Sequence, residues 1–154
     1  EAVMETFPRN AHLDARLHTA IRRFTGSLFL SPAHQGRMER LKAREGFHRK
    51  RDTPAYFAAM YLLTANDDLF LRSANCFCRH GIEFDYGTLK DISPHCYTLF
   101  SAARDIYAEG SGVALADLAN SEVVDTLAFS LIVNALLVAR YGPAVLAIKE
   151  RSRK

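Results

Sequence analysis

The sequence contains no tryptophan, and its three cysteines are Cys76, Cys78 and Cys96. An odd number of cysteines cannot pair completely within one chain, so a disulfide framework is not expected and a reducing compartment is favoured. The longest apolar region, 123–138, is interrupted by polar residues and is shorter than the roughly 20 residues of a membrane-spanning helix. The N-terminal residues also lack the pattern of a secretory signal. These absences predict a cytoplasmic protein without a membrane segment.

Motifs that identify a reaction are missing as well. The chain has no phosphate-binding Gly-Lys-Ser loop, and the turn Gly110-Ser-Gly112 lacks the third glycine of a dinucleotide site. Asp67, Asp68 and Asp85 do not follow the spacing of a calcium loop. We therefore predict that the protein is not an enzyme, and no cofactor is expected.

What the sequence does contain is a set of helix-start signals. A capping side chain followed by proline occurs at Ser31-Pro32, Thr53-Pro54 and Ser93-Pro94. The length of 154 residues and the 49% hydrophobic content fit one domain with one core. The prediction is an all-α, compact single-domain bundle of five to six helices over residues 1–154, with 1–9 and 151–154 flexible.

The helix expected at 122–140 carries the longest apolar pattern, so it is predicted to be central. It should pack against residues 56–63 and 97–107, with Leu127 and Leu131 in the core. A helix that starts at Asn66 is expected to continue to about residues 77–80. Further helices are expected at 10–24, at 32–45, from the start signal at Ser93-Pro94 to Gly110, and at 143–150.

The charges are distributed unevenly along the chain. Residues 1–51 carry eleven basic and five acidic side chains, residues 52–148 carry five and eleven, and residues 149–154 carry four and one. The net charges of +6, −6 and +3 sum to the formal +3 of the whole chain. Opposite potentials on different parts of one small protein favour a role in binding partners.

The sharpest electrostatic feature is the basic segment 37–51, and it supplies the predicted partner-binding residues: Arg37, Arg40, Lys42, Arg44, Arg49, Lys50 and Arg51. Such a segment can neutralise phosphates of a nucleic acid, or it can meet an acidic protein surface. The plain alternative is a solvated helix face, because Arg37, Arg40 and Arg44 recur at helical spacing beside apolar Met38 and Leu41.

One group of residues could hold a metal: Cys76, Cys78, His80, His95 and Cys96. Cys76 and Cys78 are too close in sequence for the usual ligand spacing of zinc sites, and a buried free cysteine commonly packs as a small apolar side chain. A thiol nucleophile beside His80 or His95 is the related catalytic alternative. We expect no metal, and zinc binding or cysteine catalysis is kept as the second alternative.

The stretch from Phe29 to Asn66 has a Phe-Leu-Ser opening, His34 shortly after it, and an apolar helix running into Thr64-Ala-Asn-Asp-Asp. Later come Leu99-Phe-Ser-Ala-Ala-Arg104, then Ala116-Asp117-Leu118 and Val133-Asn134-Ala135. These patterns, over about residues 28–142, resemble a family of small uncharacterised helical proteins of bacteria, phages and mobile elements. The resemblance implies no activity, cofactor or catalytic residue.

Together these observations predict a small non-enzymatic interaction protein, monomeric, that binds a larger protein or ribonucleoprotein. Association with mobile elements suggests an inhibitor of host machinery such as a CRISPR-type defence nuclease. The first alternative is a nucleic-acid-binding protein that uses residues 37–51.

Overall fold

The computed structural model describes residues 11–22, 27–108 and 115–147. The ends expected to be flexible, 1–9 and 151–154, lie outside these residues. Within the described part there are seven α-helices: α2 (Ala11–Arg22), α3 (Pro32–Glu45), α4 (Pro54–Leu63), α5 (Asp67–Ser73), α6 (Pro94–Ala108), α7 (Leu115–Ala119) and α8 (Thr126–Tyr141). Three short 3-10 helices are η1 (Ala74–Cys76), η2 (Phe84–Tyr86) and η3 (Pro143–Ala147).

The all-α class is confirmed, with one small exception. Strands β1 (Phe77–Cys78) and β2 (Gly81–Ile82) form an antiparallel hairpin in the register Phe77 to Ile82 and Cys78 to Gly81. The helix that starts at Asn66 therefore ends at Ser73, and the prediction that it reaches residues 77–80 was wrong. The helix expected at 143–150 is the 3-10 helix η3 in its described part.

The three start signals predicted from the sequence are confirmed by hydrogen bonds. Ser31 Oγ accepts from the backbone N–H of His34 at 3.1 Å, Thr53 Oγ1 from Tyr56 at 3.2 Å, and Ser93 Oγ from Cys96 at 3.1 Å. Each bond satisfies an N–H that has no partner inside its own helix. The start of α8 differs from expectation, because Asp125 caps it at 2.8 Å and the helix begins at Thr126.

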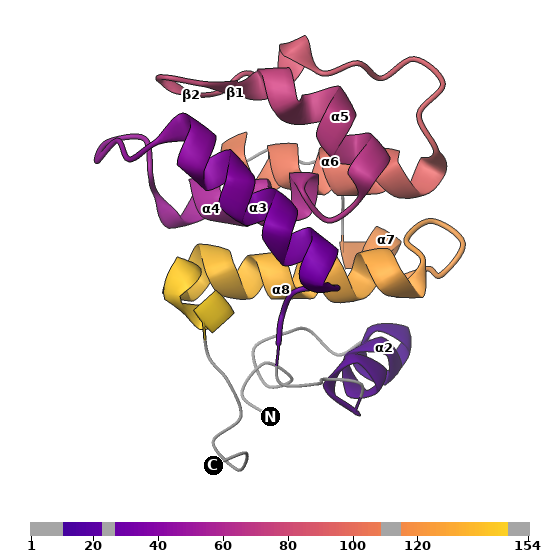
Figure 1. The fold of residues 1–154 in the computed structure, drawn as a ribbon. Coiled ribbons are helices and arrows are strands. Elements are labelled where there is room, and N and C mark those ends of the chain that lie inside the picture. The colour runs from indigo at the N-terminus through magenta and orange to yellow at the C-terminus, as the bar shows by residue number, and fades with distance from the viewer. Residues whose placement is uncertain (1–10, 23–26, 109–114, 148–154) are drawn as a thin grey trace.

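The centre of the bundle is α4, not α8 as the sequence predicted. Seven of the ten residues of α4 are buried, because its sequence PAYFAAMYLL offers no charged face to solvent and every side needs cover. Helices α6 and α8 pack against it and against each other. Figure 1 shows α4 and α6 above α8, with α3 across the front and α5 with the hairpin at the top.

A buried polar network fastens the segment before α3 to this core. His34 Nδ1 accepts from the N–H of Leu30 at 3.0 Å, and its Nε2 donates to the carbonyl of Tyr61 at 2.8 Å. The Tyr61 hydroxyl donates to the Leu28 carbonyl, and the Asn134 amide donates to that carbonyl at 3.3 Å. The network therefore joins α3, α4 and α8.

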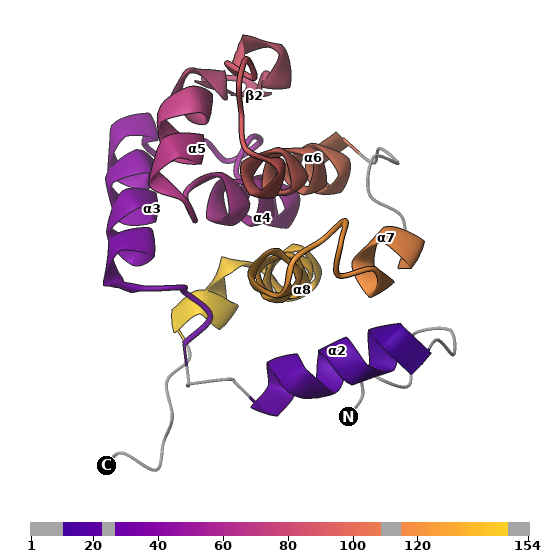
Figure 2. The ribbon, with the colours of Figure 1, turned by 90° about the vertical axis from the view of Figure 1, so that its right-hand side faces the viewer.

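Helix α2 lies outside α8, on the side away from α4 and α6 (Figure 2). It is held by buried Leu13 and Leu17 and by Arg16, which donates to the carbonyls of Leu118 at 2.6 Å and Val124 at 2.5 Å. No helix in the described residues is both long and apolar enough to cross a membrane.

Candidate functional site

The loop between α3 and α4 is built around the side chain of Arg51, which is only 3% exposed. Its Nε donates to Asp52 Oδ1 at 2.8 Å, its Nη2 donates to the Gly46 carbonyl at 2.7 Å, and the guanidinium lies 4.8 Å from the Tyr56 ring centroid. Asp52 Oδ2 in turn accepts from the N–H of His48 at 3.2 Å. A buried arginine with this many partners fixes the loop from inside.

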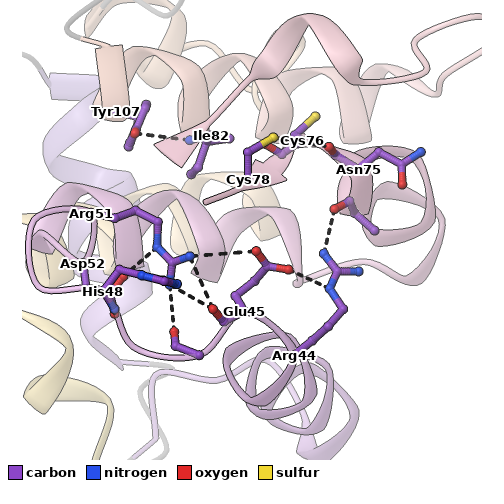
Figure 3. A network of polar contacts seen from close by, with 12 residues as sticks. Arg44, Glu45, His48, Arg51, Asp52, Asn75, Cys76, Cys78, Ile82 and Tyr107 are labelled. Atoms are coloured by element: carbon purple, nitrogen blue, oxygen red, sulfur yellow. Dashed lines mark hydrogen bonds and ion pairs between the residues drawn. The ribbon is translucent and has the colours of Figure 1, made fainter. Parts of the chain in front are cut away.

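Glu45 connects this loop to a second arginine (Figure 3). Glu45 Oε1 lies 3.9 Å from Arg51 Nη1, and its Oε2 accepts from Arg44 Nε at 2.8 Å. The Arg44 Nη2 donates to the carbonyl of Ala74 at 2.9 Å. Because Ala74 begins the 3-10 helix that leads into the hairpin, this chain of contacts ties the α3–α4 loop to the β1–β2 hairpin.

Arg37 also serves the fold. Its Nε donates to the carbonyl of Thr64 at 2.7 Å and its Nη2 to that of Ala65 at 3.0 Å. These carbonyls follow the last residue of α4, where a helix leaves acceptors without internal partners. Of the seven predicted partner-binding residues, Arg37, Arg44 and Arg51 are thus engaged within the molecule.

The other four predicted residues, Arg40, Lys42, Arg49 and Lys50, are exposed. Arg49 and Lys50 line an open hollow of about 370 Å³ between the α3–α4 loop and the hairpin turn. The residues that line this hollow, the basic hollow below, are His48, Arg49, Lys50, Arg51, Arg79 and His80. None of them is acidic. Arg40 and Lys42 do not line it, so the structure divides the basic segment into two parts.

Sequence reasoning did not place Arg79 in the site. The residue was expected near the end of a helix, 28 positions beyond Arg51 in the chain, whereas the hairpin turn brings it beside Arg49 and Lys50. The available signal was the glycine two residues later, since a glycine can mark a tight turn: Gly81 has φ +150°, a conformation that other residues rarely adopt. Among the described residues, no hydrogen bond or ion pair engages the side chains of Arg49, Lys50 and Arg79.

The hairpin turn is positioned by a close approach to α6. The Tyr107 hydroxyl accepts from the N–H of Ile82 at 3.2 Å, as Figure 3 shows. A Cβ at Gly81 would lie 2.2 Å from that hydroxyl oxygen and 3.5 Å from the ring carbon that carries it. Only glycine fits here while the tyrosine hydroxyl is present, so Gly81 and Tyr107 together fix where Arg79 lies.

Gly81→Ala is expected to lower the free energy of unfolding by about 2 to 3 kcal/mol, since the new methyl group must push the hairpin off Tyr107 and the backbone is strained. In a Tyr107→Phe background the same substitution should cost at least about 1 kcal/mol less, because the clashing oxygen is gone. Urea unfolding of the two single variants and the double variant measures both values.

Gly46→Ala is the control, since Gly46 also has a positive φ, +67°, but no atom lies within 4 Å of the position that a Cβ would take there. Gly46 combines this φ with a ψ of −173°, which glycine almost alone adopts, so Gly46→Ala should show backbone strain of about 1 to 3 kcal/mol and the same cost in both backgrounds. If Gly81→Ala lowers the free energy of unfolding equally with and without the Tyr107 hydroxyl, the close approach of Gly81 to that hydroxyl is contradicted.

The cysteine and histidine residues weighed as metal ligands lie on different elements: Cys76, Cys78 and His80 are at the hairpin, and His95 and Cys96 are in the first turn of α6. Burial raises the pKa of Asp125, but the Ala128 N–H and His95, whose Nδ1 pairs with Asp125 Oδ2 at 2.7 Å, hold that pKa below its usual range. Cys76 is buried in the hairpin region, and desolvation raises the pKa of its thiol to about 11. Among the described residues, no three His, Cys, Asp or Glu side chains are grouped so that they could hold a metal ion.

Comparison of the chain with protein-family models, with curated proteins and with solved structures gives no match. The resemblance to small helical proteins of bacteria and phages therefore stays a prediction.

Proposed function

We propose that the protein is a nucleic-acid-binding protein and that the basic hollow is its contact surface. The observation that carries this proposal is the gathering of three exposed cations, Arg49, Lys50 and Arg79, from two distant parts of the chain into one hollow without acidic residues. Like charges this close repel one another, so the arrangement costs free energy unless an anion balances it.

A nucleic-acid backbone fits this surface for two reasons. Arginine and lysine side chains neutralise successive phosphates without reading the base sequence. The loop backbone that carries Arg49 and Lys50 is also fixed before the partner arrives, because Arg51 and Asp52 hold it on both sides of the turn. A preorganised surface loses less conformational entropy on binding than a flexible basic tail does.

The protein partner expected from the sequence stays a prediction, since an acidic protein surface could meet the same cations. Inhibition of a CRISPR-type nuclease, the cytoplasmic location and the monomeric state also stay predictions. Nucleic acid is the proposal because the basic hollow is lined only by arginine, lysine and histidine, which suits a phosphate backbone better than it suits the apolar core of a stable protein interface.

A triple variant, Arg49→Ala, Lys50→Ala and Arg79→Ala, is expected to lower affinity for labelled DNA or RNA by at least about tenfold at low salt. The slope of log affinity against log salt should become less steep by roughly 2 to 3, because up to three phosphate contacts are lost. Fluorescence anisotropy over a salt series measures both quantities.

The matched control removes three exposed cations elsewhere, with Arg22→Ala, Lys90→Ala and Arg140→Ala. Either variant takes the formal net charge from +3 to 0, so a difference between them reports position and not total charge. The control should change affinity by less than about threefold. Equal losses would assign binding to net charge alone, and no binding at low salt would overturn the proposal in favour of a protein partner.

A further inference from the structure

A second hollow, the apolar hollow, adjoins the basic one. It has a volume of about 240 Å³, lies between the end of α3 and α4, and includes Phe47, Phe57 and Met60 in its lining. Arg51 lines both hollows, and the apolar hollow also has Glu45 and Asp52, both paired with Arg51, in its lining. The Lys42 ammonium lies 5.9 Å from the Phe57 ring centroid at this apolar hollow.

Phe47 is the most exposed large apolar side chain among the described residues, at 77%. Its backbone is nevertheless held on both sides, because the Gly46 carbonyl accepts from Arg51 and the His48 N–H donates to Asp52. The ring is therefore presented to solvent from a fixed position. An exposed phenylalanine gains nothing for folding, and an aromatic ring next to cations is the combination that stacks on a base.

We infer that the nucleic acid bound here is single-stranded, with its phosphates at Arg49, Lys50 and Arg79 and a base stacked on Phe47 over the apolar hollow. This inference rests on the proposed function and makes it more specific. In a duplex the base faces are covered by neighbouring base pairs, so only an unpaired nucleotide offers a free face to the ring. Stacking does not discriminate between bases, so recognition of any one sequence is not expected.

The probes are a labelled oligothymidylate of roughly a dozen nucleotides and a duplex of the same length. The protein should bind the single strand at least about tenfold more tightly than the duplex at equal salt. Phe47→Ala should weaken single-strand binding by about tenfold and change duplex binding by less than about twofold. Leu71→Ala, which removes another exposed apolar side chain, on α5, should change neither.

Phe47→Trp gives a direct reading of the contact. The chain contains no other tryptophan but has six tyrosines, so emission excited selectively at tryptophan comes from position 47 alone. Addition of oligothymidylate should quench it, and addition of duplex should leave it nearly unchanged.

The outcomes separate the two proposals. Equal affinity for single strand and duplex, together with no effect of Phe47→Ala and no quenching, would overturn the inference while leaving a cation-dependent nucleic-acid site in place. Failure of the Arg49, Lys50 and Arg79 variant to weaken either probe would overturn the proposed function itself.

Discussion

Replacing Leu131 with alanine is expected to lower the free energy of unfolding by about 2 to 5 kcal/mol. Leu131 is 2% exposed and belongs to the largest fully buried side chains of the core. It lies in the middle of α8, which packs against both α4 and α6. Truncation removes apolar contacts and leaves a cavity that rigid neighbouring helices cannot close. Urea unfolding followed by circular dichroism gives the value.

Leu127→Ala is the control on the same helix, with the same atoms removed. Leu127 was expected in the core but is 43% exposed, because it lies in the first turn of α8 beside exposed Asp125 and Thr126. Its substitution should cost less than about 1 kcal/mol. A cost at Leu127 equal to that at Leu131 would show that the first turn of α8 is covered in solution.

The features predicted correctly from the sequence are those decided by near neighbours in the chain. Ser31, Thr53 and Ser93 begin helices because each side chain reaches an N–H three residues on, and that geometry needs no tertiary contact. Which helix is central depends on tertiary packing, which the sequence pattern does not show. The long apolar pattern of 122–140 therefore favoured α8, although a larger fraction of α4 is buried. The end of α5 was predicted wrongly for the same reason, because the hairpin that follows it is held by a tertiary contact with Tyr107 of α6.

The residues of the candidate site also depend on tertiary contacts that the sequence does not reveal. The seven predicted residues are all basic, yet only the fold decides which are consumed by backbone carbonyls: Arg51 is buried, whereas its neighbour Lys50 is exposed. Arg79 could not be associated with them by sequence, because the contact depends on the tertiary position of a hairpin turn. A cluster of basic residues in a sequence therefore locates a basic region, but it does not show which of the side chains are available to bind a partner.

Lowering the pH is expected to destabilise the protein through His34. This ring is fully buried, and burial lowers its pKa from 6.5 to about 4, with nearby Arg37 acting in the same direction against the bond to Tyr61. In the unfolded chain the imidazole takes up a proton at higher pH than in the folded one, so stability falls as the pH drops from 6.5 towards 4. The loss attributable to His34 should be about 2 kcal/mol between pH 7 and 5, and about 3 kcal/mol once the pH is below 4.

The geometry explains why the proton is excluded. Nδ1 already accepts the Leu30 N–H, so a proton at that nitrogen would face another donor and detach the segment before α3. His34→Gln removes the titrating group while retaining an amide that can donate to the Tyr61 carbonyl. This variant should be less stable than the unsubstituted protein at pH 7, but its free energy of unfolding should fall by about 2 kcal/mol less between pH 7 and 5.

His18→Gln, at an exposed position of α2, is the control and should have the same pH dependence of stability as the unsubstituted protein. Urea midpoints at pH 7, 6 and 5 provide the comparison, and identical slopes for His34→Gln and the parent would show that His34 does not govern acid sensitivity.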